Sequence, residues 1–289
     1  MVVVKAPAKI NLCLDILTRL DNGYHSVWMI MQSVGLYDRV TVEKTDSGRI
    51  ELTCDNDKIP SDYRNIAWKA AIAFFEYTEV ENTGIKIHIE KKIPFAAGLA
   101  GGSADAAAVI VALNKLFETA LSEDELCKIG IKVGADVPFC IVGGTKLAED
   151  MGQIMAKLPS FSGYKVVIAK PDRGVSTKEA YEAFDSGRNI RHLDRSRILH
   201  YSAKGDYEKT FKYLENIFEQ LIEVPERVEI KDIMREHSAD VTLMSGSGPS
   251  VYGVFKNEKD ALECAEKCKK TAKEVFCCDV IAEGCKIEE

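Results

Sequence analysis

The segment Pro94-Phe-Ala-Ala-Gly-Leu-Ala-Gly-Gly-Ser-Ala-Asp105 follows a predicted strand over 84–93 and opens a predicted helix over 103–117. Nearly every side chain from Ala96 to Ala104 is small, so backbone amides can approach a ligand closely and glycines can adopt positive φ. The helix directs its free N–H groups and the positive end of its dipole at the loop. Strand, loop and helix together predict a phosphate-binding cradle. The alternative is a tight turn packed under a helix of small residues.

The loop differs from the two common nucleotide-binding motifs. It lacks Gly-Lys-Ser/Thr, so it is not a Walker motif, and it is not G-x-G-x-x-G. Ser103 offers a hydroxyl to a phosphate oxygen or to Mg²⁺. A second glycine-rich stretch, Met244-Ser-Gly-Ser-Gly-Pro-Ser250, lies between two predicted strands. Alone it predicts a flexible hairpin turn; beside the first loop it becomes a candidate wall or lid of the same site.

Two charged residues stand in apolar surroundings. Lys9 and Asn11 lie in Ala6-Pro-Ala-Lys-Ile-Asn-Leu12, and the period of a strand places both side chains on one face. Lys9 must find an anion or water there, because an unpaired buried charge is costly. Asp136 lies in Gly134-Ala-Asp-Val-Pro-Phe139. The alternatives are a snorkelling edge-strand lysine at position 9 and an aspartate at position 136 that caps a helix or lies in a turn. A Lys–Asp pair beside a phosphate site suits phosphoryl transfer, with the aspartate as base and the lysine orienting the hydroxyl.

Several other polar and aromatic residues permit two interpretations. Tyr24 and His25 follow the turn Asp-Asn-Gly, where they can stack on and hydrogen-bond a heterocycle or simply pack near the surface. Tyr181, four residues after Thr177, has the same ambiguity. Asn65 opens a predicted helix and is most simply its N-cap.

The pattern along the chain favours a mixture of strands and helices in each half. Ile85, Ile87 and Ile89 alternate with polar residues, which is typical of a half-buried strand. A Pro/Ser/Gly break over 157–163 predicts a domain boundary, and the second half predicts helices on a small antiparallel sheet. The expected strands are 1–5, 10–17, 39–43, 49–54, 84–93, 164–171, 241–244, 250–255 and 275–282. The expected helices are 65–77, 103–117, one starting at the capping box of Ser122, 177–184, 207–222, 228–237 and 259–273.

Composition narrows the class of protein. The 289 residues include 46% apolar and 29% charged residues, which is ordinary for a globular chain. With 38 basic and 45 acidic residues the net charge is -7, which argues against a nucleic-acid-binding protein. We expect no secretory signal, no membrane span and a cytoplasmic location. The nine cysteines include no C-x-x-C, so reduced thiols are expected rather than a zinc site or disulfides.

Three segments together resemble one superfamily: PAKINLCLDI near the start, IPFAAGLAGGSAD in the middle and LMSGSGPSVYGVF near the end. The chain resembles the galactokinase, homoserine kinase, mevalonate kinase and phosphomevalonate kinase (GHMP) superfamily over essentially its whole length. The resemblance implies a two-domain α+β fold. It consists of an N-terminal domain like domain 2 of ribosomal protein S5 (1–158) and a ferredoxin-like C-terminal domain (159–289), with the active site in their cleft.

Within the superfamily, the motifs are most similar to the kinases of a cytidyl-methylerythritol substrate. The added specificity comes from the runs at 9–11, 21–25, 134–138 and 174–177. This resemblance implies Mg²⁺-dependent transfer of the γ-phosphoryl group of ATP to the substrate's 2-hydroxyl, in the non-mevalonate route to isoprenoid precursors. It implies a small-molecule partner with a cytidine diphosphate group, neither nucleic acid nor membrane, and we expect a monomer or weak dimer.

The resemblance also implies roles for individual residues. Lys9 and Asp136 are the catalytic pair, and Tyr24 and Tyr181 sandwich the cytosine while His25 reads its edge. Asn11 and Thr177 line the substrate side, Asn65 lies near the adenine, and Ser103 is a candidate Mg²⁺ contact. The residues implied to hold the ATP phosphates are Pro94, Phe95, Ala96, Ala97, Gly98, Leu99, Ala100, Gly101, Gly102, Ser103 and Ala104.

The sequence departs from the superfamily pattern at two positions and leaves two alternatives. Ala100 stands where many members of the superfamily have glycine, so its backbone must adopt an angle that alanine allows. Ala104 stands where many have a second serine, so a hydroxyl group is missing from the predicted phosphate site. The first alternative is another superfamily kinase, of the homoserine or mevalonate type. Such small aliphatic substrates give no reason for two aromatic faces at Tyr24 and Tyr181. The second is a non-catalytic module that binds a nucleotide or RNA. The net negative charge argues against this alternative, and so does the presence of both Lys9 and Asp136.

Overall fold

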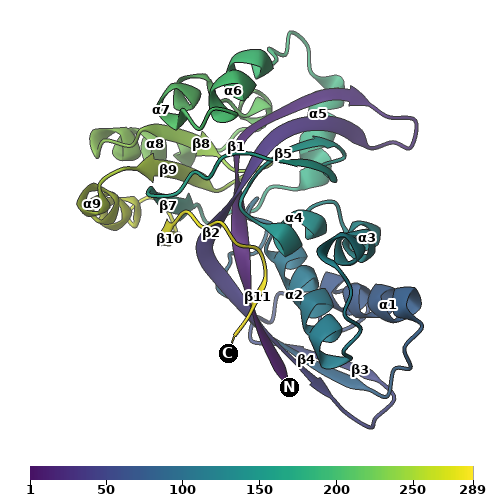
Figure 1. Cartoon of the computed structure of the whole chain (residues 1–289). Coiled ribbons are helices and arrows are strands. Elements are labelled where there is room, and N and C mark those ends of the chain that lie inside the picture. Colours follow the sequence, from purple (N-terminus) through teal and green to yellow (C-terminus); the bar gives the residue numbers. More distant parts are fainter. Residues whose placement is uncertain (289) are drawn as a thin grey trace.

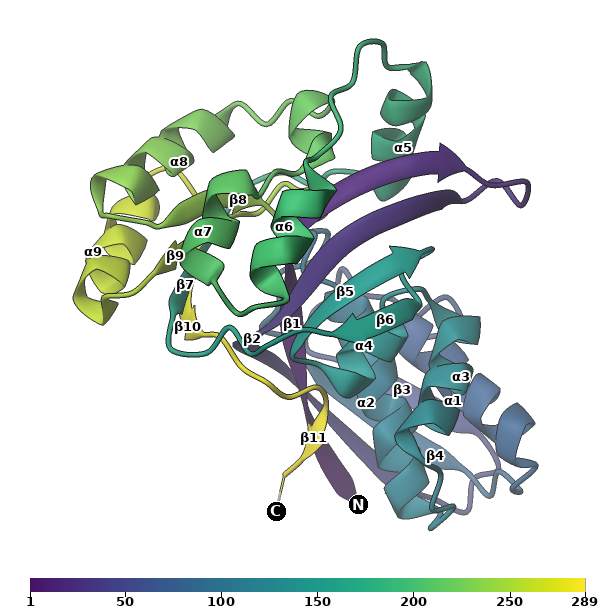
Figure 2. The same ribbon diagram turned by 45° about the horizontal axis from the view of Figure 1, so that its top comes forward.

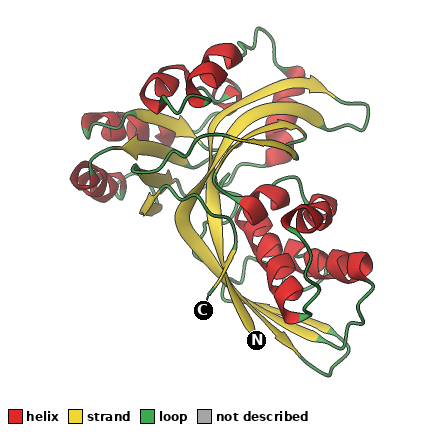
Figure 3. Ribbon diagram, viewed as in Figure 1, coloured by secondary structure: helices red, strands yellow, loops and turns green. Residues whose placement is uncertain are grey.

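One long antiparallel hairpin forms the frame of the molecule. The computed structural model describes residues 1–288, and the hairpin consists of β1 (Val2–Arg19) and β2 (His25–Lys44). The pairing register shifts after Pro7, Asn11 and Ile16, and such bulges bend and twist a strand. The hairpin therefore curves through the molecule, as Figure 3 shows. The predicted break between strands 1–5 and 10–17 is wrong, because Pro7 lies at a bulge, where a strand tolerates a missing N–H.

The first sheet is built around this hairpin. Its strand order is β11-β1-β2-β4-β3, and β5 pairs with both β2 and β6. Ile85, Ile87 and Ile89 are fully buried, as their alternation predicted. β3 and β4 are parallel, whereas the other pairs of this sheet are antiparallel. The added strands are β3 (Ile50–Cys54), β4 (Ile85–Glu90), β5 (Thr145–Asp150), β6 (Ile154–Lys157) and β11 (Lys286–Ile287).

Four helices cover one face of this sheet, as Figure 1 shows. α2 packs directly on β1 and β2, because its alanines are small and fully buried. The capping box predicted at Ser122 is present, with Glu125 as its partner. The sequence did not predict α4, which is only six residues long. The helices are α1 (Ile66–Thr78), α2 (Gly101–Leu116), α3 (Glu123–Val133) and α4 (Val137–Val142).

The second sheet confirms the predicted ferredoxin-like arrangement. Its four antiparallel strands have the order β10-β7-β9-β8, and α8 and α9 pack against them. In chain order this is 4-1-3-2, the order of a split β-α-β unit. The elements are β7 (Lys165–Lys170), α8 (Glu226–Glu236), β8 (Val241–Met244), β9 (Val251–Phe255), α9 (Glu258–Cys268) and β10 (Glu274–Asp279).

The segment between β7 and β8 contains short helices. In Figure 2, α5 lies beside the far end of the β1–β2 hairpin. The single helix predicted over 207–222 is wrong, because Leu214 is extended and Asn216 binds the carbonyls of Met244 and Gly246 instead of continuing a helix. The elements are α5 (Thr177–Ser186), α6 (Arg195–Ser202), α7 (Tyr207–Thr210), η1 (Phe211–Tyr213) and η2 (Ile217–Gln220).

The end of the chain returns to the N-terminal sheet. β11 pairs with β1 through Val4 and Ile287, and both termini lie close together in Figure 1. The division at 158/159 stays a prediction, and this strand joins the C-terminal segment to the first sheet. The part of the chain that the structure describes has no helix long and apolar enough to span a bilayer. All nine cysteines are free thiols.

Candidate active site

Backbone and hydroxyl hydrogen bonds join the three motifs found in the sequence. The amide of Lys9 donates to the carbonyl of Leu99 at 3.1 Å, which attaches β1 to the first glycine loop. The amide of Asn11 donates to the Ser245 hydroxyl at 3.2 Å, and this hydroxyl donates to the carbonyl of Gly98 at 2.9 Å. The second glycine-rich stretch is therefore a wall fixed against the first loop and β1.

A cleft of about 1110 Å³ opens where these motifs meet. The predicted site residues that line it are Lys9, Asn11, Tyr24, His25, Asn65, the residues 94–103, Asp136, Thr177 and Tyr181. Ala104 does not line the cleft. Its side chain is fully buried in the core, so its position does not support the role in phosphate binding that the resemblance implied.

The first glycine loop uses positive φ at every second residue. Ala96, Gly98 and Ala100 have φ values of 51°, 74° and 58°. Ala100 therefore adopts the left-handed conformation that glycine takes most easily, and it does so as the N-cap of α2. Its methyl group cannot accept a hydrogen bond from the first turn, so the amides that begin α2 remain available to an anion.

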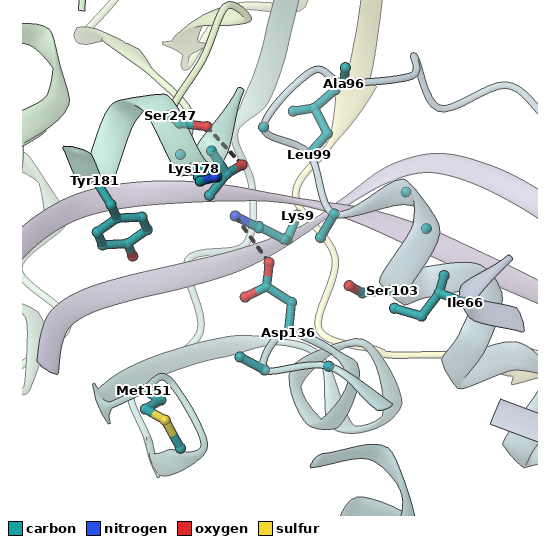
Figure 4. A pocket seen from close by; sticks show the side chains of 18 of the residues that line it. Lys9, Ile66, Ala96, Leu99, Ser103, Asp136, Met151, Lys178, Tyr181 and Ser247 are labelled. Carbon is teal, nitrogen blue, oxygen red and sulfur yellow. Dashed lines mark hydrogen bonds and ion pairs between the residues drawn. The ribbon is translucent and has the colours of Figure 1, made fainter. Parts of the chain in front are cut away.

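Lys9 and Asp136 point toward one another across the cleft, as Figure 4 shows. The Lys9 Nζ and Asp136 Oδ2 atoms are 3.8 Å apart, and Lys9 also donates to Asn11 Oδ1 at 2.6 Å. Asp136 stands at the N-cap position of α4, but its side chain makes no capping hydrogen bond. The capping alternative is therefore wrong for its carboxylate, which faces the lysine instead. Lys9 is 5% exposed, so the snorkelling alternative is also wrong.

The spacing of this pair suits a hydroxyl group. The Lys9 Nζ and Asp136 Oδ2 atoms are 3.8 Å apart. A hydroxyl oxygen can therefore lie about 2.8 Å from each of them, with an angle near 90° at that oxygen. Such an alcohol would donate its proton to Asp136 and accept a hydrogen bond from Lys9. The arrangement can therefore orient and deprotonate an alcohol beside the amides of the glycine loop.

The aromatic wall differs from the predicted sandwich. Tyr181 stacks on His25, with ring centroids 4.8 Å apart and 22° between the planes. Burial and the nearby Asp136 carboxylate raise the pKa of Tyr181 to about 12, so its hydroxyl stays protonated. Tyr24 is 66% exposed at the rim of the cleft. One tyrosine face thus already has a partner, and the cytosine sandwich stays a prediction.

Two models of known protein domains match this chain, one in each half. Residues 65–144 match the model "GHMP kinases N terminal domain", and residues 196–274 match "GHMP kinases C terminal". The chain belongs to the GHMP kinase family. This confirms the family resemblance and the two-domain α+β fold, and members of the family are ATP-dependent phosphotransferases.

Curated relatives of this GHMP kinase share one name. The chain is 44% identical over 276 residues to a 4-diphosphocytidyl-2-C-methyl-D-erythritol kinase from Caldicellulosiruptor saccharolyticus, with 95% of each chain covered. It is 41% identical to the kinase of the same name from Clostridium acetobutylicum, covering 94% of this chain and 98% of the relative.

Solved structures show the same fold. A crystal structure of a 4-(cytidine 5'-diphospho)-2C-methyl-D-erythritol kinase aligns with a TM-score of 0.77 and 29% identity, covering 96% of this chain and 98% of that one. Homoserine kinase from Cytophaga hutchinsonii aligns with a TM-score of 0.79 and 20% identity, covering 99% and 97%. The second likeness concerns the fold alone.

Asn65 and Thr177 hold two walls of the cleft of this GHMP kinase. Asn65 caps α1 as predicted, because its Oδ1 accepts from the amide of Ala67 at 2.8 Å and its Nδ2 donates to the carbonyl of Pro60 at 2.7 Å. Its amide oxygen and nitrogen therefore each have a partner within the protein, and its proximity to adenine stays a prediction. The hydroxyls of Thr177 and Ser247 lie 3.2 Å apart, which joins α5 to the second glycine-rich stretch.

A buried charge cluster that the sequence did not predict lies under the first loop. Lys91 forms ion pairs with Asp38 and with Asp105, the latter at 2.7 Å. Asp38 also accepts from the amides of Lys92 and Ile93 at 2.6 and 2.8 Å, so it fixes the chain where β4 leads into the loop. Burial raises the pKa of Asp105 well above its usual value, despite the opposing effect of Lys91. Asp105 within an apolar helix was the one available signal in the sequence, because its partners are distant along the chain: Asp38 lies in β2, and Lys91 follows β4.

Proposed function

We propose that this protein transfers the γ-phosphoryl group of ATP to the 2-hydroxyl of 4-(cytidine 5'-diphospho)-2-C-methyl-D-erythritol. The observation that carries the proposal is the Lys9–Asp136 pair, 3.8 Å apart in a cleft bordered by the glycine loop. The names of relatives 44% and 41% identical over nearly the whole chain support this substrate.

The chemistry assigned to the pair is an in-line transfer. The 2-hydroxyl oxygen, oriented by Lys9, forms a bond to the γ-phosphorus as the bond from phosphorus to the bridging oxygen breaks and ADP leaves. The hydroxyl proton passes to the Asp136 carboxylate. Residues 94–103 and the first amides of α2 would hold the phosphates and stabilise their charge without reorganising. Asn11, which accepts from Lys9, keeps the ammonium in place.

Mg²⁺ fits this site as a companion of ATP. Residues 1–288 contain no cluster of three or more His, Cys, Asp or Glu side chains that could hold a metal ion alone. The cleft instead offers the Ser103 hydroxyl beside the loop. Such a sparse set of protein ligands suits Mg²⁺, which keeps waters and takes further oxygens from the phosphates. When bound, Mg²⁺ would supply charge neutralisation on the β- and γ-phosphates, and Ser103 would be its contact.

The cytidyl substrate is favoured over the other two functions considered. The aromatic wall of Tyr24, His25 and Tyr181 suits a heterocycle better than homoserine or mevalonate. A module that binds a nucleotide or RNA without catalysis would not need an ion pair placed to activate an alcohol. A cytoplasmic location and a monomeric or weakly dimeric state remain predictions.

An ATP-consumption assay with purified protein tests the function. We expect ADP formation that requires the cytidyl substrate and Mg²⁺, with a phosphate ester appearing at the 2-position in ³¹P NMR. Turnover with homoserine or mevalonate instead would favour another kinase of the family. Nucleotide binding without turnover of any alcohol would favour the non-catalytic module.

A further inference from the structure

A single carboxylate joins α5 to both strands of the hairpin. Asp185 Oδ1 lies 2.7 Å from His25 Nε2, and its Oδ2 lies 3.2 Å from Arg19 Nη1. Arg19 and His25 are paired residues across β1 and β2, at the last register position before the turn. Asp185 therefore contacts the hairpin end through two residues held side by side.

The imidazole ring of His25 is held on several sides by α5. Tyr181 stacks on its face, and Phe184 meets it edge-on with centroids 5.8 Å apart. The His25 side chain is 6% exposed and lines the cleft. Within residues 1–288, the bond to Asp185 is the one hydrogen bond of this side chain.

The bond to Asp185 decides which ring nitrogen carries the proton. A carboxylate accepts hydrogen bonds and cannot donate them, so Nε2 must be the N–H donor. In a neutral imidazole Nδ1 is then a lone-pair acceptor. Arg19 offsets the charge of Asp185, so the three groups are neutral together when the buried ring is neutral.

We propose that Asp185 is a positioning residue that makes the site specific for cytosine, by holding His25 in the tautomer whose Nδ1 accepts from the base's 4-amino group. This inference rests on the proposed function, because it assumes that His25 faces the cytosine. Cytosine presents an N–H donor at position 4, whereas uracil presents a carbonyl oxygen there. An accepting Nδ1 therefore matches cytosine and opposes the lone pairs of uracil, and such mismatches give strong discrimination.

The variant Asp185→Asn tests this role. An asparagine side chain offers both an acceptor and a donor to Nε2, so both tautomers of His25 become populated. We expect the ratio of kcat/KM for the cytidyl substrate to that for its uridyl analogue to fall about tenfold, the loss of one hydrogen bond of moderate strength. We expect KM for ATP to stay the same. Glu179→Gln, on the same helix but outside the cleft, is the matched control and should keep the ratio.

A spectroscopic measurement separates positioning from a general structural role. In ¹⁵N-labelled protein, long-range ¹H–¹⁵N correlations should identify the Nε2–H tautomer of His25 in the wild type and a mixture of tautomers in Asp185→Asn. The His25→Asn variant assigns the signal. An unchanged base preference in Asp185→Asn, or a wild-type His25 that is the Nδ1–H tautomer or doubly protonated, would overturn the inference. A wild type that does not phosphorylate the cytidyl substrate would instead contradict the proposed function.

Discussion

The hydroxyl of Ser245 donates a hydrogen bond of 2.9 Å to the backbone carbonyl of Gly98. This bond joins the loop before α2, in the first half of the chain, to the turn between β8 and β9 in the second half. The amide of Asn11, two residues beyond Lys9, donates to the same hydroxyl. The first glycine loop, the strand that carries Lys9 and the ferredoxin-like half are therefore joined through one side chain.

Gly98→Ala should disrupt this junction. A Cβ atom at position 98 would lie 2.1 Å from the carbonyl oxygen of Ser245, and φ is +74°. We expect the free energy of unfolding to fall by about 2 kcal/mol or more, with a higher KM for ATP, because backbone atoms must move. Gly163→Ala is the control, since its φ is +90° and no atom lies within 4 Å of the added carbon. It should cost only about 1 to 2 kcal/mol of backbone strain. Equal denaturant midpoints for the two variants would show that the contact with Ser245 is unimportant.

Asp136→Asn should separate catalysis from binding. The asparagine keeps the shape of the side chain at the start of α4 but cannot accept the proton of the alcohol. We expect kcat to fall by roughly 10²-fold or more, the usual cost of losing a general base. Stopped-time assays at saturating ATP and substrate measure this, and binding of an ATP analogue checks the site. A variant that turns over at the wild-type rate would remove Asp136 from the mechanism.

Tyr24→Ala should weaken binding of the cytidyl substrate. Tyr24 is 66% exposed at the rim of the cleft, so its truncation should hardly change protein stability. Loss of one stacking face should reduce affinity by about 1–3 kcal/mol, seen as a higher KM for the substrate. Tyr63→Ala is a control with similar exposure, at 70%, and lies outside the cleft. A change confined to the KM for ATP would contradict the cytosine assignment.

Local sequence patterns located many of the helices and strands and marked Lys9 and Asp136, whereas the two-domain fold followed from the resemblance to the family. Apolar and polar residues alternate from Ile85 to Ile89, which is typical of a strand. Ser122 and Glu125 form the predicted capping box. The apolar surroundings of Lys9 and Asp136 indicated that both charges need partners. The failures occurred where tertiary contacts decide the conformation. Asn216 ends a helix-like pattern because it binds two distant carbonyls, and no local signal shows this.

The dependence on tertiary contacts also explains why the buried charged residues could not be predicted from the sequence. Asp38 lies in β2, Lys91 directly follows β4 and Asp105 lies in α2. Asp38 and Lys91 look ordinary in the sequence, and Asp105 is unusual only as a charged residue in an apolar helix. Likewise Asp185 looks like an exposed helix residue until α5 is placed against the hairpin. Ionic contacts between distant elements depend on the three-dimensional arrangement, which the spacing of motifs does not encode.

Asp105 provides a test of the buried cluster through the pH dependence of stability. Burial raises its folded-state pKa above the usual 3.8, and its Oδ1 atom has no hydrogen-bond partner among residues 1–288. Between these two pKa values the folded chain holds a proton that the unfolded chain has released. The contribution of Asp105 to stability is therefore greatest below about pH 4 and falls as the pH rises through the folded-state pKa.

Asp105→Asn should remove this contribution, because asparagine does not titrate and can still accept from Lys91. We expect the free energy of unfolding of the variant to decline less steeply with pH than that of the wild type from pH 4.5 to 8, measured by urea denaturation at fixed ionic strength. Asp172→Asn is the matched control, because Lys273 lowers the pKa of this exposed carboxyl, so its contribution to stability changes only below about pH 4. From pH 4.5 to 8 its profile should therefore run parallel to that of the wild type. If Asp105→Asn and the wild type have parallel profiles, Asp105 is ionised throughout this range, and the cluster carries a net negative charge beneath the first glycine loop.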